Sequence, residues 1–258
     1  MSRDQITAFI IGSPQDSQVR RISQSLSSYF DVEIVSPVFL ASGDLRDPEK
    51  VDLCAFKARH LREPLLGEVG CAMAHLSVYR NVGLSDAEWA LVLEDDVDVA
   101  DGLQLRMRLE QIVAHFPGKS PVIANLNARA ARPFLRAKTS PVDGLWLPAV
   151  STFTTSAYLL NQSAAALLIS RQSPVRAQAD WPVNPSDVLF LQESLVNVTP
   201  IEGSPSAVDP EGKRSHFPLR LRASMWSGLW FWRNRKYFKG LRDYWCSVLK
   251  VRIYRHLY

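Results

Sequence analysis

The first part of the chain alternates short apolar runs with amphipathic stretches. Residues 6–12 are an apolar run that predicts a buried first strand. Val19, Ile22 and Leu26 follow at i, i+3 and i+7, the spacing of one helical face, and residues 31–38 alternate like a second strand. This β-α-β order predicts a parallel α/β sheet, which places ligands beyond the carboxyl ends of its strands.

Strand and helix patterns continue to alternate along most of the chain. An apolar stripe predicts a helix over residues 67–84. Residues 41–66 are expected to form loop with a short helix, and residues 173–194 an irregular Pro-rich segment leading into a short element. Further strands are predicted over residues 88–97, 121–128 and 151–160, and a helix over residues 161–170. We therefore expect one α/β domain over residues 1–218, followed by a tail over residues 219–258.

Composition narrows the class of protein. The chain has 258 residues, of which 47% are hydrophobic and 22% charged, as suits a soluble globular protein. Cys54, Cys71 and Cys246 are too few and too scattered for a disulfide framework or a four-ligand zinc site, so a reducing compartment is expected. No stretch reaches the ~18 uninterrupted apolar residues of a membrane helix, and the first apolar run lacks the features of a secretory signal. A cytoplasmic protein is predicted.

The tail differs from the body in charge. Residues 219–258 carry ten Lys or Arg and one acid, a net +9, whereas the 20 basic and 25 acidic residues before them leave −5. The tail also holds four Trp and four Tyr. Amphipathic rings among basic residues are typical of segments that dock on a membrane surface without spanning it.

Two other interpretations of the tail remain open. It could form a helical pair that packs on the body with its basic face in solvent. It could also bind nucleic acid, since basic and aromatic side chains suit phosphates and bases. No recognised nucleic-acid module accompanies it, so we expect a membrane partner and no nucleic-acid partner.

An acid cluster follows the apolar run of residues 91–93. The segment LVLEDDVDV places Glu94, Asp95, Asp96 and Asp98 within five positions. Carboxylates at the end of a strand suit Mg²⁺ or Mn²⁺, which usually share their coordination with substrate phosphates. The alternative is a solvated loop whose acids cap the following helix. Strand alternation would separate Asp95 from Glu94 and Asp96, so the four acids are not expected to bind one ion.

The helix before this strand carries a polar pair. In GEVGCAMAH, Glu68 and His75 lie two turns apart on one helical face. Such a pair could line a pocket beside the acid-ended strand. The alternative is a buried histidine with satisfied hydrogen bonds and a glutamate on the helix surface.

Taken together, the two segments resemble a known family. LLGEVGCAMAHLSVYRNV followed by WALVLEDDVDV is similar to glycosyltransferase family 25, the bacterial lipopolysaccharide-core and lipooligosaccharide glycosyltransferases, with its G-E-x-G-C-x-x-S-H helix and its E-D-D-V strand end. AFIIGSPQDSQVRRI, TTSAYLLNQSAAALLI and QADWP match the family more loosely, so the resemblance covers residues 5 to about 202. Ala74 replaces the serine of the helix motif, and Thr154 replaces the glycine before Thr155.

The resemblance implies a GT-A-type, Rossmann-like domain that binds a nucleotide sugar. By its motifs Glu94, Asp95 and Asp96 would bind a divalent ion, Mn²⁺ or Mg²⁺, and the sugar diphosphate. We add Asp98 as a further metal ligand. Residues that would line the donor pocket, besides Glu94 and Asp95, are Glu68, His75, Arg20 and Thr155.

Members of the family mostly invert the anomeric carbon, which requires a base opposite the leaving UDP. Asp180 in the QADWP segment is the predicted base, with Asp187 as the second candidate and Glu193 as the third. The alternative for Asp180 is a cap in a Pro-rich loop.

The predicted function is transfer of a hexose, galactose or glucose, from a UDP-sugar to a lipopolysaccharide-type acceptor. Because such an acceptor is lipid-linked, the protein is expected to lie on the inner face of the inner membrane, with its tail on the surface. Two rivals remain, namely a metal-dependent nucleotide-sugar hydrolase or phosphotransferase and a membrane-bound nucleotide-sugar-binding protein without catalysis.

Overall fold

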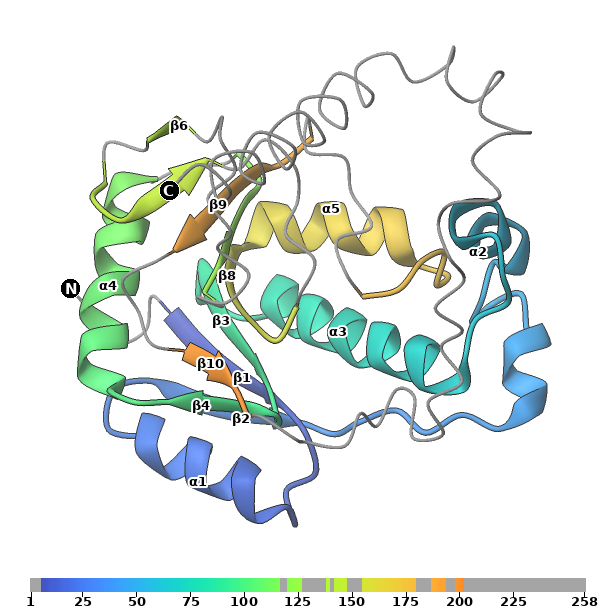
Figure 1. The fold of residues 1–258 in the computed structure, drawn as a ribbon, viewed down its shortest axis with the longest axis horizontal. Coiled ribbons are helices and arrows are strands. Elements are labelled where there is room, and N and C mark those ends of the chain that lie inside the picture. Colours follow the sequence, from blue (N-terminus) through green and yellow to red (C-terminus); the bar gives the residue numbers. More distant parts are fainter. Residues whose placement is uncertain are drawn as a thin grey trace, which may run out of the picture.

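The computed structural model describes residues 6–116, 120–126, 138–139, 142–147, 155–179, 187–193 and 198–201 (Figure 1). Its helices are α1 (Ser17–Leu26), α2 (Leu53–His60), α3 (Leu66–Leu84), α4 (Gly102–His115), α5 (Gln162–Gln172) and the 3₁₀ helix η2 (Ser42–Arg46). Its strands are β1 (Ile6–Ile11), β2 (Asp31–Val35), β3 (Trp89–Glu94), β4 (Val97–Val99), β5 (Val122–Asn125), β6 (Lys138–Thr139), β7 (Leu145–Leu147), β8 (Ala157–Asn161), β9 (Leu189–Glu193) and β10 (Val198–Pro200).

Eight of the described strands form one mixed sheet in the order β2-β1-β3-β8-β5-β9-β7-β6. Strands β1, β2 and β3 are parallel neighbours, as are β5 and β9, whereas β8 runs antiparallel to both β3 and β5. The predicted α/β class and its opening β-α-β unit are therefore confirmed. The expectation of a parallel sheet does not hold for β8, β7 and β6, which pair antiparallel with their neighbours.

The direction of β8 follows from how the chain reaches it. Strand β5 ends at the same edge of the sheet as β3, and the chain comes back into β8 from that edge. A parallel neighbour needs a crossover, usually a helix, to return the chain to the opposite edge, and the described part of the 126–156 connection holds only the short strands β6 and β7. Strand β8 starts at Ala157, after Thr155 and Ser156, and not at the predicted residue 151; residues 151–154 lie outside the described ranges.

Helices cover both faces of the sheet, and the alternating side chains of β1 show the division. Ile6, Ala8 and Ile10 pack in a cluster with the buried faces of α1 and α4. Phe9 and Ile11 point to the other face and pack with α3 and α5, which lie side by side (Figure 1). This layered arrangement leaves the carboxyl ends of β1 and β3 between the layers.

The close approach of α3 to the segment after β2 depends on Gly70. A Cβ atom at this position would lie 2.3 Å from the backbone carbonyl oxygen of Val38, a contact that real Cβ atoms do not make. Glycine in the GEVGC motif therefore lets the first turns of α3 lie against residues 36–40. This close packing helps to position α3 so that His75 lies beside Glu94 at the end of β3.

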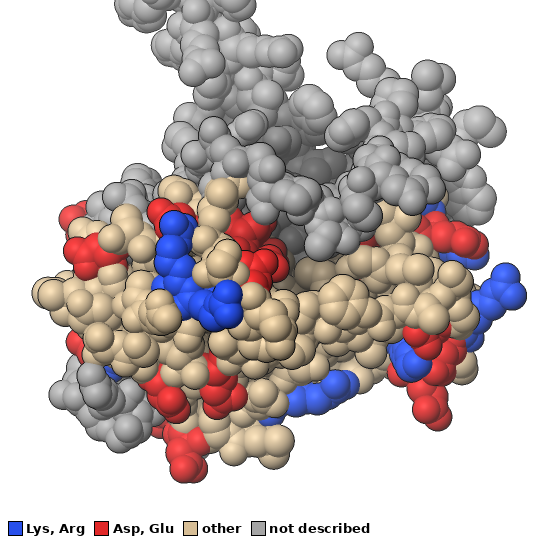
Figure 2. Space-filling model, turned by 90° about the horizontal axis from the view of Figure 1, so that it is seen from below, with Lys and Arg blue, Asp and Glu red and all other residues tan. Residues whose placement is uncertain are grey.

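The predicted tail, residues 219–258, lies outside the described residues, as does the end of the predicted 1–218 domain. Within the described ranges, no helix combines the length and apolarity needed to cross a membrane. On the face that carries α1, acidic and basic side chains are interspersed (Figure 2). The described surface on this face therefore has no continuous basic patch for a polyanion.

Candidate functional site

The acid cluster lies at the carboxyl edge of the sheet, where β1 and β3 end side by side. Glu94 closes β3 and pairs in register with Ile11 at the end of β1. The backbone N–H of Glu94 donates a hydrogen bond to the carbonyl of Ser156 at 2.8 Å, just before β8 begins. The end of β3 is therefore fixed on both sides, and Asp95 and Asp96 form the turn that follows.

Gly12, the residue after β1, allows this edge to close around Asp95. A Cβ atom on Gly12 would lie 2.5 Å from Val19 Cγ2 and 3.0 Å from Asp95 Cβ. Any larger residue would push away either α1 or the acidic turn. The approach of backbone to carboxylate here resembles the close approach that ligand-binding turns of α/β proteins require.

Glu94 is the carboxylate of the cluster that the protein itself satisfies. Its Oε1 accepts a hydrogen bond from Thr155 Oγ1 at 2.9 Å and lies 3.1 Å from His75 Nε2. The other ring nitrogen, His75 Nδ1, lies 2.7 Å from the Tyr158 hydroxyl, which donates to Tyr79 at 3.2 Å. Burial would raise the pKa of Glu94, but the contacts with His75 and Thr155 outweigh it and hold that pKa below its ordinary value.

Asp95 and Asp96 have the opposite electrostatics. Burial, with the charges of Glu94 and Asp95, raises the pKa of Asp96 to about 6. Burial, with the charges of Glu94 and Asp16, also raises the pKa of Asp95. Asp96 Oδ1 is buried and has no hydrogen-bond partner among the described residues. A shielded carboxylate oxygen beside two further acids fits a hard divalent cation.

Asp98 and Arg20, also predicted for the site, lie at the surface. Asp98 is exposed on β4 and forms a salt bridge with Arg21 of α1 at 3.2 Å. Arg20 is exposed on the same helix. The cap of α4 is Asp101, an acid three residues beyond Asp98, which accepts from the Gln104 N–H at 2.9 Å; the helix-capping alternative therefore does not hold for Asp98.

Glu68 is buried, with 2% of the residue exposed, and its carboxylate is fully engaged. It accepts from Arg62 Nη1 at 2.7 Å and from the Leu65 N–H at 3.0 Å, and it also binds Arg62 Nη2 and Gln178 Nε2. These hydrogen bonds outweigh the burial that would raise the pKa of Glu68 and hold it below its ordinary value. The alternative of a glutamate on the helix surface is therefore wrong, and the donor-binding role stays a prediction.

The three candidate bases fall in different places. Asp180 lies outside the described residues, directly after the anchored segment 175–179. Asp187 precedes the amino end of β9, which runs parallel to β5 and in the same direction as β3, so it lies at the sheet edge opposite Glu94. There it pairs with Arg171 at 3.2 Å. Glu193 is fully buried and bonded to Arg108 Nε at 2.7 Å.

Cys71 is a neighbour of the site that the motif analysis left without a role. Donor atoms of Cys71, His75 and Glu94 all lie within 4.8 Å of one another. Tyr158, which is hydrogen-bonded to His75, and Tyr79, which accepts from Tyr158, were also missed. The sequence signal for Cys71 and Tyr79 is their i, i+4, i+8 spacing with His75, which places three polar groups on one face of α3.

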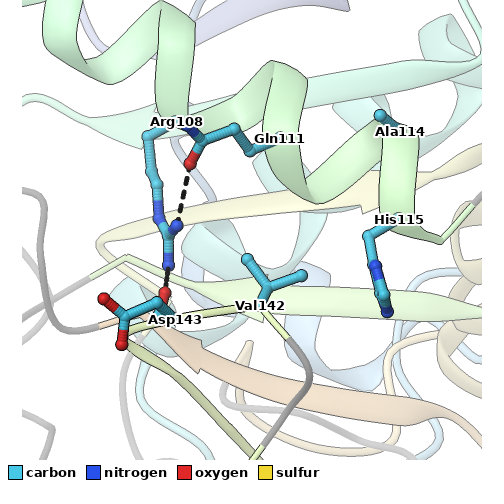
Figure 3. A pocket seen from close by; sticks show the side chains of 6 residues that line it. All are labelled: Arg108, Gln111, Ala114, His115, Val142 and Asp143. Atoms are coloured by element: carbon cyan, nitrogen blue, oxygen red, sulfur yellow. Dashed lines mark hydrogen bonds between the residues drawn. The ribbon is translucent and has the colours of Figure 1, made fainter.

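An open pocket of about 390 Å³ lies between α4 and the turn at Val142 and Asp143 (Figure 3). It shares no residue with the acid cluster. The Arg108 guanidinium at its side is already bonded to Gln111, to the Asp143 carbonyl and to Glu193. These partners occupy the Arg108 guanidinium, so this side chain is not available to bind an anion in the pocket.

Comparison with known proteins gives a family model match and distant structural neighbours. Among solved structures, the chain is similar to a glycosyltransferase involved in the glycosylation of the major capsid of PBCV-1, with 10% identity, TM-score 0.33, and 63% of this chain and 62% of that chain covered. It is also similar to mannose-1-phosphate geranyltransferase from Thermus thermophilus, with 15% identity, TM-score 0.39 and coverage of 66% and 61%. A third is mouse xyloside xylosyltransferase 1, apo form, with 11% identity, TM-score 0.30 and coverage of 67% and 60%.

These structural likenesses assign no function at such TM-scores, and the chain spans less than two thirds of the length of each structure. No curated protein matches the chain. The model described as glycosyltransferase family 25 (LPS biosynthesis protein) matches residues 47–183, more than half of the sequence. This span includes α3 and the acidic turn after β3, and the chain belongs to glycosyltransferase family 25.

Proposed function

We propose that this protein transfers a hexose, galactose or glucose, from a UDP-sugar to a lipopolysaccharide or lipooligosaccharide-type saccharide. The observation that carries the proposal is a buried oxygen at the carboxyl edge of β3. Asp96 Oδ1 is shielded from solvent and has no hydrogen-bond partner within the described residues. It lies in the span that matches a lipopolysaccharide-biosynthesis glycosyltransferase family. A GT-A-type donor site at this edge agrees with the rule that α/β sheets bind ligands beyond the carboxyl ends of their strands.

In this proposal Asp96, with Asp95 beside it, holds a divalent ion, Mn²⁺ or Mg²⁺. When bound, the ion neutralises the charge that develops on the diphosphate leaving group. Asp98 is the weakest member of the predicted metal set, because its carboxylate is exposed and paired with Arg21. The three acids do not form a converging ligand group in the described structure, so phosphate oxygens would complete the coordination.

Two other donor-site residues differ in how they are held: Glu94 is fixed by hydrogen bonds, whereas Arg20 is exposed on α1. Glu94, fixed by His75 and Thr155, orients the start of the acidic turn and keeps its charge near the ion. Arg20 on the exposed face of α1 can reach outward to the nucleotide sugar. Gly12 lets the end of β1 lie close to Asp95 of the acidic turn.

Asp180 is the proposed base, deprotonating the acceptor hydroxyl in an inverting reaction. Support comes from the segment just before it, which several contacts fix. Gln172 Nε2 donates to the Ala177 carbonyl at 2.6 Å, and Gln178 is bonded to Glu68. Asp187 is a poor alternative because it lies at the opposite sheet edge.

The basic tail is proposed to dock the enzyme on the inner membrane, near a lipid-linked acceptor.

The first test is a calorimetric titration of UDP into the full-length protein, with and without Mn²⁺. We expect binding only with the ion, because the acidic turn alone repels a diphosphate. Binding that ignores the ion, or no binding at all, would contradict the donor site. UDP release from a UDP-sugar that is independent of acceptor would favour the hydrolase, and binding without turnover would favour a non-catalytic protein.

The second test compares Asp180→Asn with Asp187→Asn as a matched control. Asp180→Asn should keep metal-dependent UDP binding and lose at least about 100-fold in transfer to a saccharide acceptor, since a positioned base contributes about 10²–10⁴-fold. Asp187→Asn should keep wild-type transfer. The reverse result would move the role of base to Asp187.

A further inference from the structure

Cys71, His75 and Glu94 bring together three different metal-binding groups. Cys71 and His75 lie one turn apart on α3, and Glu94 faces them from the end of β3. One donor atom from each residue lies within 4.8 Å of the other two. A thiol, an imidazole and a carboxylate in such a group differ from the all-oxygen environment of the neighbouring Asp95 and Asp96.

The surroundings of His75 favour a metal ligand. His75 is only 1% exposed, and the Tyr158 hydroxyl lies 2.7 Å from His75 Nδ1. In the tautomer whose Nδ1–H donates to Tyr158, with Tyr158 donating to Tyr79, Nε2 has a free lone pair, and a cation between Nε2 and Glu94 would replace the hydrogen bond that joins them in the metal-free protein. Metal-bound histidines typically have their second nitrogen held by such a hydrogen bond, which fixes the tautomer and the ring orientation.

The spacing between the ligands also fits. His75 Nε2 and Glu94 Oε1 lie 3.1 Å apart. Two nitrogen or oxygen ligands on a tetrahedral zinc ion lie about 3.3 Å from each other, given bond lengths of about 2.0–2.2 Å. Thr155 Oγ1 donates to the same Glu94 oxygen at 2.9 Å and so holds the carboxylate in place. Thiolate with imidazole selects Zn²⁺ over Mn²⁺ or Mg²⁺.

We propose that Cys71, His75 and Glu94 form a binding site for a thiophilic divalent cation such as Zn²⁺. The three protein ligands leave a fourth position for water or another exchangeable ligand. Binding releases the thiol proton of Cys71 to solvent and gives a Cys71 thiolate and a neutral His75 with its proton on Nδ1. The site shares His75 and Glu94 with the proposed donor site but takes its cation on Cys71, and it ties α3 to the end of β3 one residue before the acidic turn.

The test uses Co²⁺ as a spectroscopic probe on the full-length protein after removal of metals with a chelator. A thiolate ligand on Co²⁺ gives a charge-transfer absorption that oxygen ligands do not give. We expect this band to appear with one Co²⁺ per chain and to disappear when Zn²⁺ is added. Cys71→Ser should abolish the band, while Cys54→Ser and Cys246→Ser, which alter the other two cysteines, should retain it.

Two further variants separate this site from the acidic turn. Asp96→Asn should leave the thiolate band intact, because Asp96 belongs to the oxygen-ligand site. His75→Gln should weaken Zn²⁺ binding at least about 10-fold, measured by competition with a chelating dye, and circular dichroism should show whether the variant is folded. A band that persists in Cys71→Ser, a band lost in Cys54→Ser or Cys246→Ser, or no band in wild type would overturn the proposal.

Discussion

Glu68 and Asp96 both belong to the two-part motif of the family, yet the structure treats their carboxylates in opposite ways. Glu68, at the start of α3, is bonded to Arg62, to the Leu65 N–H and to Gln178, and its pKa is held low. Asp96, after β3, has a buried oxygen without a partner in the described structure and a pKa raised to about 6. A carboxylate that the protein satisfies is suited to holding the fold, and one that it leaves unsatisfied is suited to a ligand.

This contrast separates two regions of one site. Around Glu68, hydrogen bonds link α3 to the end of α2 and to residues 176–179, so that region sets the geometry. Around Asp96, like charges crowd a short turn, so that region is suited to binding a cation. Motif matching alone does not distinguish Glu68 from Asp96, whereas their hydrogen bonds do.

The largest expected effect is on ligand binding at Asp96. Asp96→Asn should weaken Mn²⁺-dependent UDP binding about 100-fold, or about 2.7 kcal/mol, because the substitution removes a charged ligand from the ion. The free energy of unfolding without metal should rise by about 1 kcal/mol, since the native state no longer shields an unpaired charge. Calorimetry and chemical denaturation measure the two quantities.

Asp98→Asn serves as the matched control for this variant. Asp98 belongs to the same acidic segment but is exposed and paired with Arg21, so its substitution should change UDP affinity by less than about threefold. Equal losses in the two variants would mean that the segment acts through its overall charge. The contrast between satisfied and unsatisfied carboxylates would then fail.

The next effect is on stability at Glu68. Glu68→Ala should lower the free energy of unfolding by about 2–3 kcal/mol, because it leaves Arg62, Gln178 and the Leu65 N–H without their shared acceptor. The remaining folded protein should bind UDP with Mn²⁺ within about threefold of wild type. Denaturation curves and calorimetry again provide the measurements.

Glu63→Ala is the control for Glu68, because Glu63 pairs with Lys57 on the surface nearby and has a 76% exposed side chain. Its substitution should change stability little. If Glu68→Ala instead lost UDP binding and kept wild-type stability, Glu68 would be a donor-pocket residue, as the family resemblance implies.

Much of the fold could be predicted because the spacing of apolar residues along the chain indicates which side chains are buried. The apolar run of β1 and the i, i+3, i+7 spacing in α1 each became the expected element. Periodicity does not encode strand direction, so the parallel sheet predicted from the opening β-α-β pattern did not include the antiparallel β8. Its direction depends on the connection from β5, a tertiary property that no local pattern reveals.

The site was predictable in its position and less so in its internal contacts. The strand ending in acids placed Glu94, Asp95 and Asp96 correctly at the carboxyl edge. Which acid would be satisfied depended on Thr155 and His75, brought in from the start of β8 and from α3 by the tertiary fold. The edge occupied by Asp187 likewise followed from sheet topology and not from its distance along the sequence.

The smallest expected effect is a pH dependence at His60, at the end of α2 in the Glu68 region. Burial, with the charges of Arg59 and Arg62, lowers the pKa of His60 to about 4, and its Nε2 accepts from the Gln178 N–H at 3.4 Å. The unfolded chain takes up a proton on His60 near pH 6.5, whereas the folded chain does so only near pH 4. The contribution of neutral His60 to the free energy of unfolding is therefore fully present above pH 6.5 and is lost as the pH falls toward 4. We expect a loss of about 1–2 kcal/mol, reduced for the partial exposure of the ring. His60→Gln should flatten this slope in denaturation curves between pH 4.5 and 7. An unchanged slope would assign it to the carboxylates instead, and the acid sensitivity of the Glu68 region would then owe nothing to the histidine that contacts Gln178.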